Sequence, residues 1–231
     1  MSSSSDKPTS PPDDTGALPD FGVPLPGARL VARLERAQGR GLVGPGAVSE
    51  HVSHALGFVR AWEAVAGPGA FTGAGVDLGS GGGLPGLVLA LAWPESAWVL
   101  LDSHQRAVTF LEEAVGELGL AGRVDIVRAR AEEYGRGDGR GRAALVVARG
   151  FGAPAVTAEC AAPLLAVGGR LVVSEPPEAE DRWPADGLAA LGLRPAQLVN
   201  MGARFQVLVQ VEPCPASYPR RIGVPVKRPL F

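Results

Sequence analysis

The sequence is poor in cysteine, histidine and aromatic residues. The scarcity of cysteine by itself excludes two kinds of site. Only 2 of its 231 residues are cysteines, Cys160 and Cys214, which are far apart and form no CxxC pair. This excludes a disulfide framework and a cysteine zinc site, and it fits a reducing compartment. No apolar run reaches the roughly 18 residues of a membrane span. The net charge is only −2, so any contact with nucleic acid needs a local basic patch.

The N-terminal segment lacks the apolar residues that folding requires. Residues 1–25 hold a run of serines, several prolines and scattered aspartates, without the apolar core of a signal peptide. Such a segment buries too little surface to offset the entropy of ordering. We therefore expect a disordered tail over 1–25 and a cytoplasmic protein. A domain is expected over 26–213, with a helical cover at 26–68, followed by a basic, extended tail at 214–231; the oligomeric state stays open, with a monomer the simplest expectation.

Glycine is abundant, with 32 residues, and one glycine-rich stretch organises the chain. Residues 75–86 read GVDLGSGGGLPG, an apolar strand that ends in Asp77 and turns through glycines into a helix opened by Pro85. A glycine turn lets a ligand lie against bare backbone, and the helix N-terminus offers N–H donors to a carboxylate. We interpret the stretch as a binding site for S-adenosylmethionine (AdoMet), with predicted contacts from Asp77, Gly79, Ser80, Gly81, Gly83, Leu84 and Pro85.

The same stretch also satisfies the dinucleotide fingerprint, through Gly81, Gly83 and Gly86. Asp77 favours AdoMet, because a pyrophosphate would be repelled at this strand end whereas the ammonium group of methionine would not. A second apolar strand ends in Asp102, about 20 residues after the turn, as expected for an acid that holds ribose hydroxyls. Another nucleotide-binding function and a purely structural turn remain as alternatives.

Strands and helices alternate along the rest of the chain. Strands are expected at 74–78, 97–102, 124–127, 144–148 and 170–174, helices at 27–39, 46–66, 85–92, 104–119 and 154–166, and a terminal hairpin at 195–201 and 204–211. This order predicts an α/β, Rossmann-like class I AdoMet-dependent methyltransferase fold: a mostly parallel seven-stranded sheet with a terminal antiparallel hairpin and N-terminal helices. Ligands of such sheets bind at the carboxyl ends of the strands. The further predicted cofactor contacts at these ends are Asp102, Ser103, Ala131, Glu132 and Arg149, of which Ser103 is also expected to cap the following helix.

The strand over 144–148 indicates which atom would be methylated. It continues into Arg149-Gly150-Phe151 and lacks the Asn/Asp-Pro-Pro-aromatic feature typical of enzymes that act on exocyclic base amines. Neither cysteine follows a strand, which disfavours carbon methylation through a thiolate. Guanine N7 carries an in-plane lone pair and needs no base. We predict that Arg149 and Arg130 position such a substrate, Arg149 at guanine O6 or a phosphate; Phe151 is either a stacking residue or part of the core.

Basic residues dominate the C-terminal end. After Glu212 no acid remains, and Arg220, Arg221, Lys227 and Arg228 add four positive charges. Four phosphate contacts to single-stranded RNA would give a log–log salt slope of about −3. We predict RNA contacts for these four residues; the alternative is a solubilising end.

Several blocks together resemble the GidB family, the small-subunit ribosomal RNA guanine-N7 methyltransferases. The similar blocks are 76–86 with its Pro-Gly, Leu101-Asp102-Ser103 with Arg106, 130–133, Ala148-Arg149-Gly150 and the tail at 218–230. The tail is the most family-specific of them, since other methyltransferases share the glycine turn. The resemblance implies transfer of the AdoMet methyl group to N7 of a guanine in 16S ribosomal RNA, as free RNA or in the small subunit.

The sequence also departs from the family pattern. His54 fits the family's histidine, but Gly57 and Phe58 stand where Asp or Asn and Ser are usual, and Ser174-Glu175-Pro176 stands where Lys-Gly is usual. An acid gained beside the expected RNA path keeps two alternatives open. One is an AdoMet-dependent methyltransferase of another substrate, a small molecule or another RNA. The other is a non-catalytic nucleotide-binding module that attaches to ribosomes.

Overall fold

The computed structural model describes residues 27–178 and 182–231, so the tail predicted at 1–25 lies outside the described residues. Its strands are β1 (Ala74–Leu78), β2 (Ala97–Asp102), β3 (Val124–Arg128), β4 (Ala143–Ala148), β5 (Leu165–Glu175), β6 (Leu193–Asn200) and β7 (Arg204–Gln210). They form one seven-stranded sheet in the order β3-β2-β1-β4-β5-β7-β6. Only the pairs that involve β7 are antiparallel. The predicted class I methyltransferase fold, with its terminal hairpin, is confirmed.

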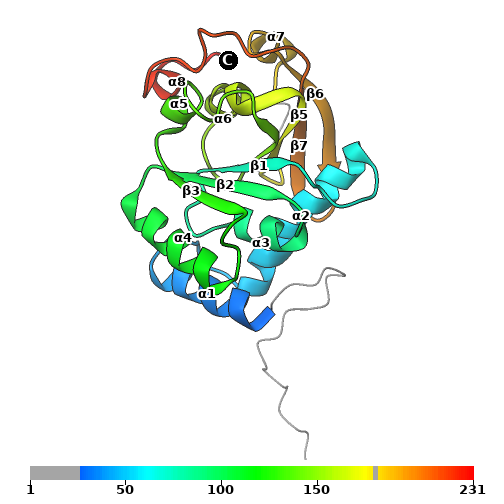
Figure 1. The fold of residues 1–231 in the computed structure, drawn as a ribbon. Helices are drawn as coiled ribbons and strands as arrows, with labels where there is room; N and C mark the ends of the chain where they lie inside the picture. Colours follow the sequence, from blue (N-terminus) through cyan, green and yellow to red (C-terminus); the bar gives the residue numbers. More distant parts are fainter. Residues whose placement is uncertain (1–26, 179–181) are drawn as a thin grey trace, which may run out of the picture.

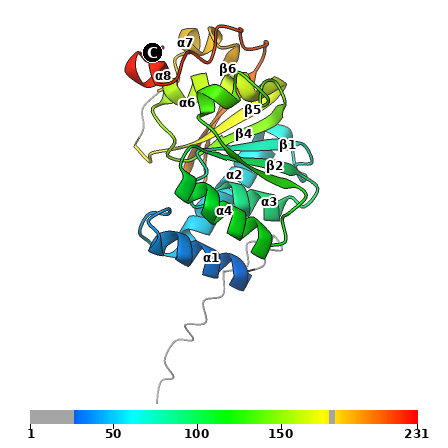
Figure 2. The same ribbon diagram turned by 60° about the vertical axis from the view of Figure 1, so that its left-hand side comes forward.

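Helices cover both faces of this sheet. They are α1 (Gly27–Gly39), α2 (Val48–Ala66), α3 (Gly86–Ala92), α4 (Gln105–Glu117), α5 (Ala131–Tyr134), α6 (Pro154–Ala161), the 3-10 turn η1 (Ala162–Leu164), α7 (Ala185–Ala189) and α8 (Val224–Lys227). Figures 1 and 2 show α1 to α4 on one face and α5, α6, α7 and α8 on the other. No helix in the described part of the chain is both long and apolar enough to cross a membrane.

Two local predictions differ from the structure. The helix expected over 154–166 ends at Ala161, because Pro163 in η1 cannot donate to a continuing helix. Strand β5 therefore starts early, with Leu165 opposite Ala143, and its register shifts before Leu145 pairs with Arg170. Ser103 does not cap α4: the N-cap residue is His104, which makes no side-chain capping bond.

Each face of the sheet has its own hydrophobic core. On the α2 side, the Trp93 and Trp98 rings stack with their centroids 6.3 Å apart, and Phe71 packs against both. The core of the other face consists mainly of aliphatic residues from β4, β5, α6 and α7. Helix α1 is fixed to α4 by Arg33, which is 2% exposed and forms ion pairs with Glu113 and Glu117. This attachment places the loop over residues 40–46 against the glycine turn, where Val43 packs onto Gly82.

The C-terminal segment folds onto the protein, although the sequence predicted an extended tail over 214–231. Glu159 in α6 is fully buried, and Arg220 pairs with it through Nη2 at 2.6 Å and through its backbone N–H at 2.8 Å. Arg140 donates to the carbonyls of Tyr218 and Cys214, each at 2.7 Å. A buried carboxylate needs such partners, because an unpaired charge in the interior is strongly unfavourable. The segment includes α8, which lies beside α6 near the top of Figure 1, and its last residue, Phe231, packs onto Gly187 of α7.

Candidate functional site

Asp77 lies at the carboxyl end of β1, directly before the glycine turn. Its side chain is buried, and Oδ2 accepts the Gly86 N–H at 2.9 Å, which fixes the start of α3. The other oxygen, Oδ1, is buried and has no hydrogen-bond partner among the described residues. Burial raises the pKa of Asp77 to about 7, against hydrogen bonding that lowers it. Oδ1 therefore keeps its capacity to accept a hydrogen bond.

The glycines of the turn differ in what a Cβ atom at each position would contact. A Cβ on Gly86 would lie 2.6 Å from Asp77 Oδ2, so the hydrogen bond between them requires a glycine. Cβ atoms on Gly82 and Gly83 would collide with Val43 and Leu87, at 2.4 and 2.3 Å. The sequence interpretation treated Gly79, Gly81 and Gly83 as bare backbone for a ligand; in the structure, the protein's own side chains occupy the Cβ sides of Gly82 and Gly83. Gly81 differs, since its nearest neighbour on the Cβ side is 3.5 Å away.

Asp102 joins the end of β2 to the same turn. Its Oδ2 accepts the Gly81 N–H at 2.9 Å, and its Oδ1 accepts the His104 N–H at 2.8 Å. Oδ1 also lies 3.0 Å from His104 Nδ1. Both oxygens are therefore engaged in holding the backbone at two strand ends, while the carboxylate still borders the adjacent cavity.

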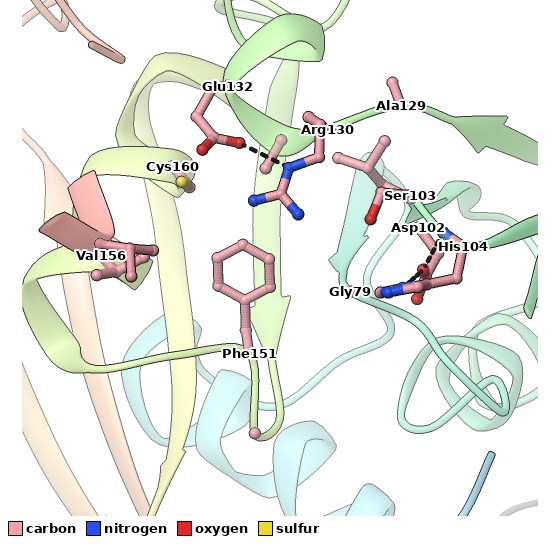
Figure 3. Close-up of a pocket in the computed structure, with 14 residues that line it drawn as sticks. Gly79, Asp102, Ser103, His104, Ala129, Arg130, Glu132, Phe151, Val156 and Cys160 are labelled. Atoms are coloured by element: carbon pink, nitrogen blue, oxygen red, sulfur yellow. Dashed lines mark hydrogen bonds and ion pairs between the residues drawn. The ribbon is translucent and has the colours of Figure 1, made fainter. Parts of the chain in front are cut away.

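A cavity of about 260 Å³ opens at the carboxyl ends of β1 to β4 (Figure 3). Of the predicted site residues, those that line it are Gly79, Asp102, Ser103, Arg130, Ala131 and Glu132. Those that do not are Asp77, Ser80, Gly81, Gly83, Leu84, Pro85 and Arg149. The structure thus brings together the end of the glycine turn, the β2 acid and the block at 130–132, which are remote in the sequence.

Sequence reasoning named Phe151 as a stacking or core residue, but it did not predict the rest of this part of the cavity wall. Phe151 points into the cavity from the end of β4, and Val156 and Cys160 border it from α6 (Figure 3). Val226 of α8 closes another side. A Cβ on Gly79 would lie 2.8 Å from the Phe151 ring, so the two positions are packed together. An aromatic residue two positions after Arg149 was a visible signal, whereas nothing in the sequence placed Val226 here.

The polar end of the cavity is set by Glu132. Its side chain is buried; Oε1 accepts the Gly223 N–H at 3.0 Å, and Oε2 lies 3.5 Å from Arg130 Nε. Burial alone would raise the pKa of Glu132, but the Gly223 hydrogen bond and Arg130 bring it below its usual value. The Cys160 thiol nearby has a pKa raised by burial to about 12, so it remains protonated and is no nucleophile.

Arg149 lies against helix α2. Its Nη2 is 2.9 Å from His51 Nδ1, and its Nη1 is buried without a hydrogen-bond partner among the described residues. Burial lowers the pKa of the guanidinium, and the charge of Asp77 opposes that shift. Nearby, burial together with the charge of Arg149 lowers the pKa of His54 to about 4. An always-charged arginine with one free nitrogen therefore lies close to Asp77 and to a neutral histidine.

The four predicted RNA contacts fall into two groups. Arg220 is committed to the buried Glu159 and also donates to the Arg228 carbonyl at 2.7 Å. The side chains of Arg221, Lys227 and Arg228 are exposed. No group of three or more His, Cys, Asp or Glu side chains that could hold a metal occurs within 27–178 and 182–231.

Comparison with protein families gives one match over most of the described chain. Residues 29–190 match the family model GidB, described as rRNA small subunit methyltransferase G. Ribosomal RNA small subunit methyltransferase G of Rubrobacter xylanophilus is 40% identical over 167 residues, which are 67% of this chain and 64% of that protein. The Deinococcus radiodurans protein of the same name is 40% identical over 166 residues, 68% of this chain and 65% of that protein. The aligned chain thus spans just under two thirds of these relatives.

Solved structures agree on the fold. A putative methyltransferase, yhhF, from Escherichia coli superposes with a TM-score of 0.54 at 16% identity, covering 74% of this chain and 90% of that one. A Corynebacterium glutamicum protein superposes with a TM-score of 0.57 at 18% identity, covering 84% of this chain and 94% of that one. At such low identities these matches support the architecture alone.

Proposed function

Because this chain belongs to the rRNA small subunit methyltransferase G family, we propose that it transfers a methyl group from AdoMet to N7 of a guanine in 16S ribosomal RNA. The observation that carries the proposal is the buried Oδ1 of Asp77 at the carboxyl end of β1, which has no hydrogen-bond partner among the described residues. A class I fold with a free acceptor at this place suits the amino-acid end of AdoMet.

The residues of the site fit AdoMet in three parts. Asp77 Oδ1 would accept from the methionine ammonium. Gly81 is the least crowded glycine of the turn, with the Leu42 carbonyl oxygen 3.5 Å from its Cβ position. Asp102 borders the cavity where ribose hydroxyls would lie, and it still has lone pairs beyond those taken by the Gly81 and His104 amides. Ala131 and Glu132, with Ser103 on the opposite wall, would hold the adenine end. The tail participates through Val226 and through the Gly223 bond to Glu132.

Methyl transfer needs little covalent help from the protein. AdoMet supplies a methyl carbon on a positively charged sulfur, which a nitrogen lone pair can attack directly. Guanine N7 has such a lone pair in the ring plane, so no residue has to remove a proton first. The work of this chain is to align the base behind that carbon and to exclude water, an effect worth up to about 7–11 kcal/mol.

Two arginines and one aromatic ring are available for that alignment. We assign Arg149 to guanine O6 or a neighbouring phosphate, because its Nη1 is unpaired. Arg130 is 45% exposed at the edge of the cavity and would meet RNA phosphate while it stays beside Glu132. Phe151 offers the face of its ring between the cofactor cavity and the incoming base.

The partner would be 16S RNA or the small ribosomal subunit in the cytoplasm. Arg221, Lys227 and Arg228 are exposed and available for phosphates on the α8 side of the cavity, whereas we assign Arg220 to the fold. The acid at Glu175 had favoured a different substrate. Its side chain is 5% exposed and pairs with Arg182 at 3.2 Å, so the charge of Glu175 itself is largely neutralised.

The direct test is transfer of tritiated methyl groups from AdoMet to purified small subunits and to free 16S RNA, followed by nucleoside analysis. We expect N7-methylguanine with the wild-type protein. In Gly81→Val, a branched side chain replaces a glycine at φ +51°, so the turn and AdoMet binding should be lost. A protein that binds AdoMet and labels no RNA would contradict the proposal and favour another substrate. Wild-type AdoMet affinity in Gly81→Val would contradict the assignment of the turn.

A further inference from the structure

His51 contacts two different parts of the site from the first turns of α2. Its Nε2 lies 3.1 Å from the carbonyl oxygens of Gly44 and Pro45, and its Nδ1 lies 2.9 Å from Arg149 Nη2. Carbonyl oxygens only accept, so Nε2 must carry the proton. A guanidinium only donates, so Nδ1 must be the bare nitrogen. The contacts therefore specify a neutral ring with the proton on Nε2.

We infer that His51 is a positioning residue: it orients Arg149 toward the substrate through Nδ1 and holds the loop over residues 40–46 through Nε2. The inference rests on the proposed function, since it assigns the purpose of Arg149 to RNA methylation. His51 itself touches neither the cofactor cavity lining nor, in this account, the RNA.

A neutral partner suits Arg149 better than an acid would. The arginine side chain has several rotatable bonds and must be fixed if it is to meet one atom of a base. A carboxylate would fix it but would also neutralise the charge that attracts RNA. Asp77 lies close enough to interact electrostatically with Arg149. A histidine acceptor on the α2 side holds Nη2, leaves Nη1 free and keeps the positive charge.

The loop held by Nε2 lies directly on the glycine turn. The Leu42 carbonyl is 3.5 Å from the Cβ position of Gly81, and Val43 packs onto Gly82. Gln38 anchors the same loop independently, because its Nε2 donates to Gly44 O at 3.0 Å and to Gly46 O at 2.8 Å. Loss of one anchor should therefore leave the loop in place, whereas Arg149 Nη2 has His51 as its hydrogen-bonding partner in the described chain.

Two substitutions separate the two contacts. In His51→Asn, the amide oxygen takes the place of Nδ1, so the acceptor for Arg149 is kept and the loop contact is lost. In His51→Gln, the amide nitrogen takes the place of Nε2, so the loop contact is kept and the acceptor is lost. Gln38→Ala is the matched control, since it removes a loop anchor without touching Arg149.

The experiment measures kcat and KM for methylation of small subunits, AdoMet affinity by calorimetry and the melting temperature of each variant. We expect His51→Gln to lose about tenfold or more in kcat/KM for RNA, the scale of one lost charge-assisted hydrogen bond. His51→Asn and Gln38→Ala should stay within about threefold of wild type, and AdoMet affinity should be unchanged throughout. Equal losses in His51→Asn and His51→Gln, or full activity in His51→Gln, would overturn the inference.

A spectroscopic measurement keeps the inference testable even if the wild-type protein does not methylate RNA. The chain has only 3 histidines, so ¹⁵N-labelled imidazole signals can be assigned by substitution. At neutral pH we expect a protonated Nε2 and a bare, hydrogen-bonded Nδ1 on His51, with the Nδ1 signal shifting in Arg149→Ala. A proton on Nδ1, or no response to Arg149→Ala, would rule out the pairing. Absent RNA methylation with the expected spectrum would instead count against the proposed function alone.

Discussion

The ring of Phe205 in β7 occupies the space where a side chain on Gly57 of α2 would begin. A Cβ built on Gly57 would lie 2.4 Å from the ring, and Phe205 is fully buried. The Phe58 and Phe205 rings meet edge to face with their centroids 4.8 Å apart. The resemblance to the GidB family leads one to expect Asp or Asn at 57 and Ser at 58. The two departures are therefore linked by packing: Gly57 leaves space for the ring of Phe205, which packs against Phe58.

Gly57→Ala should destabilise the protein, with Gly116→Ala as its control. Both glycines lie in helices, but a Cβ on Gly116 of α4 meets nothing within 4 Å. We expect Gly57→Ala to lower the free energy of unfolding by about 1–3 kcal/mol through overpacking. Gly116→Ala should raise it by about 0.5–1 kcal/mol through helix propensity. Urea unfolding checks both, and a neutral Gly57→Ala would show that the core adjusts freely around Phe205.

His54 should make the fold sensitive to acid. Its pKa is lowered from 6.5 to about 4, mainly by burial. Between these two pH values the unfolded state therefore binds a proton that the folded state does not. The stability present above pH 6.5 is therefore lost as the pH falls toward 4. The full slope would be about 1.4 kcal/mol per pH unit, reduced here because the ring is partly exposed to solvent. His54→Asn should flatten the unfolding free energy between pH 6.5 and 4; an unchanged slope would contradict the assignment.

AdoMet binding should release a proton from Asp77. The pKa of Asp77 is raised to about 7 by burial, so at or below this pH much of the free protein carries it protonated. A bound ammonium favours the carboxylate, and AdoMet affinity should rise with pH up to about 7. In the free protein the sign for stability is opposite: the folded state holds the proton more tightly, so stability falls as the pH rises from 3.8 to about 7.

Calorimetry in buffers of different ionisation enthalpy measures this proton directly. Wild-type protein at pH 6 should release a fraction of a proton on binding AdoMet, whereas Asp77→Asn should bind more weakly and release none. Equal proton release in both proteins would show that another group titrates.

The C-terminal cations should separate into structural and RNA-binding residues. Replacing Arg221, Lys227 and Arg228 by Ala together should weaken RNA binding and reduce the log–log salt slope by about 2, at about 0.7 per contact. Arg29→Ala on α1 is the control, since it removes an exposed charge at the opposite end of the molecule (Figure 1). Arg220→Ala should instead lower stability by about 3–5 kcal/mol, because it removes the ion-pair partner of the fully buried Glu159. If the triple substitution left the salt slope of RNA binding unchanged, the role of the tail would be purely structural.

Local patterns predicted much of this structure. The apolar run at 97–102 matches β2 residue for residue, and the acid-glycine-proline stretch marked the end of β1 correctly and the start of α3 to within one residue. These features depend on neighbours in the sequence, where hydrophobic periodicity and turn residues have their effect.

Such local patterns could not predict contacts between segments that are far apart in the sequence. The Arg149–His51 pair spans 98 residues, and Gly223 reaches Glu132 across 91. The tail was expected to be extended because prolines and cations dominate it. The acid that holds it, Glu159, is fully buried, and nothing in the local sequence around it indicates that burial. Likewise, nothing in the local sequence showed that Leu87 packs onto Gly83, which stays a predicted cofactor contact.

Mass mapping of 16S ribosomal RNA from cells with and without the gene tests the proposed methylation most directly. We predict that deletion removes one N7-methylguanine, that the wild-type gene restores it, and that a gene carrying Gly81→Val does not. An unaltered amount of N7-methylguanine after deletion would contradict the assignment of this chain to that reaction.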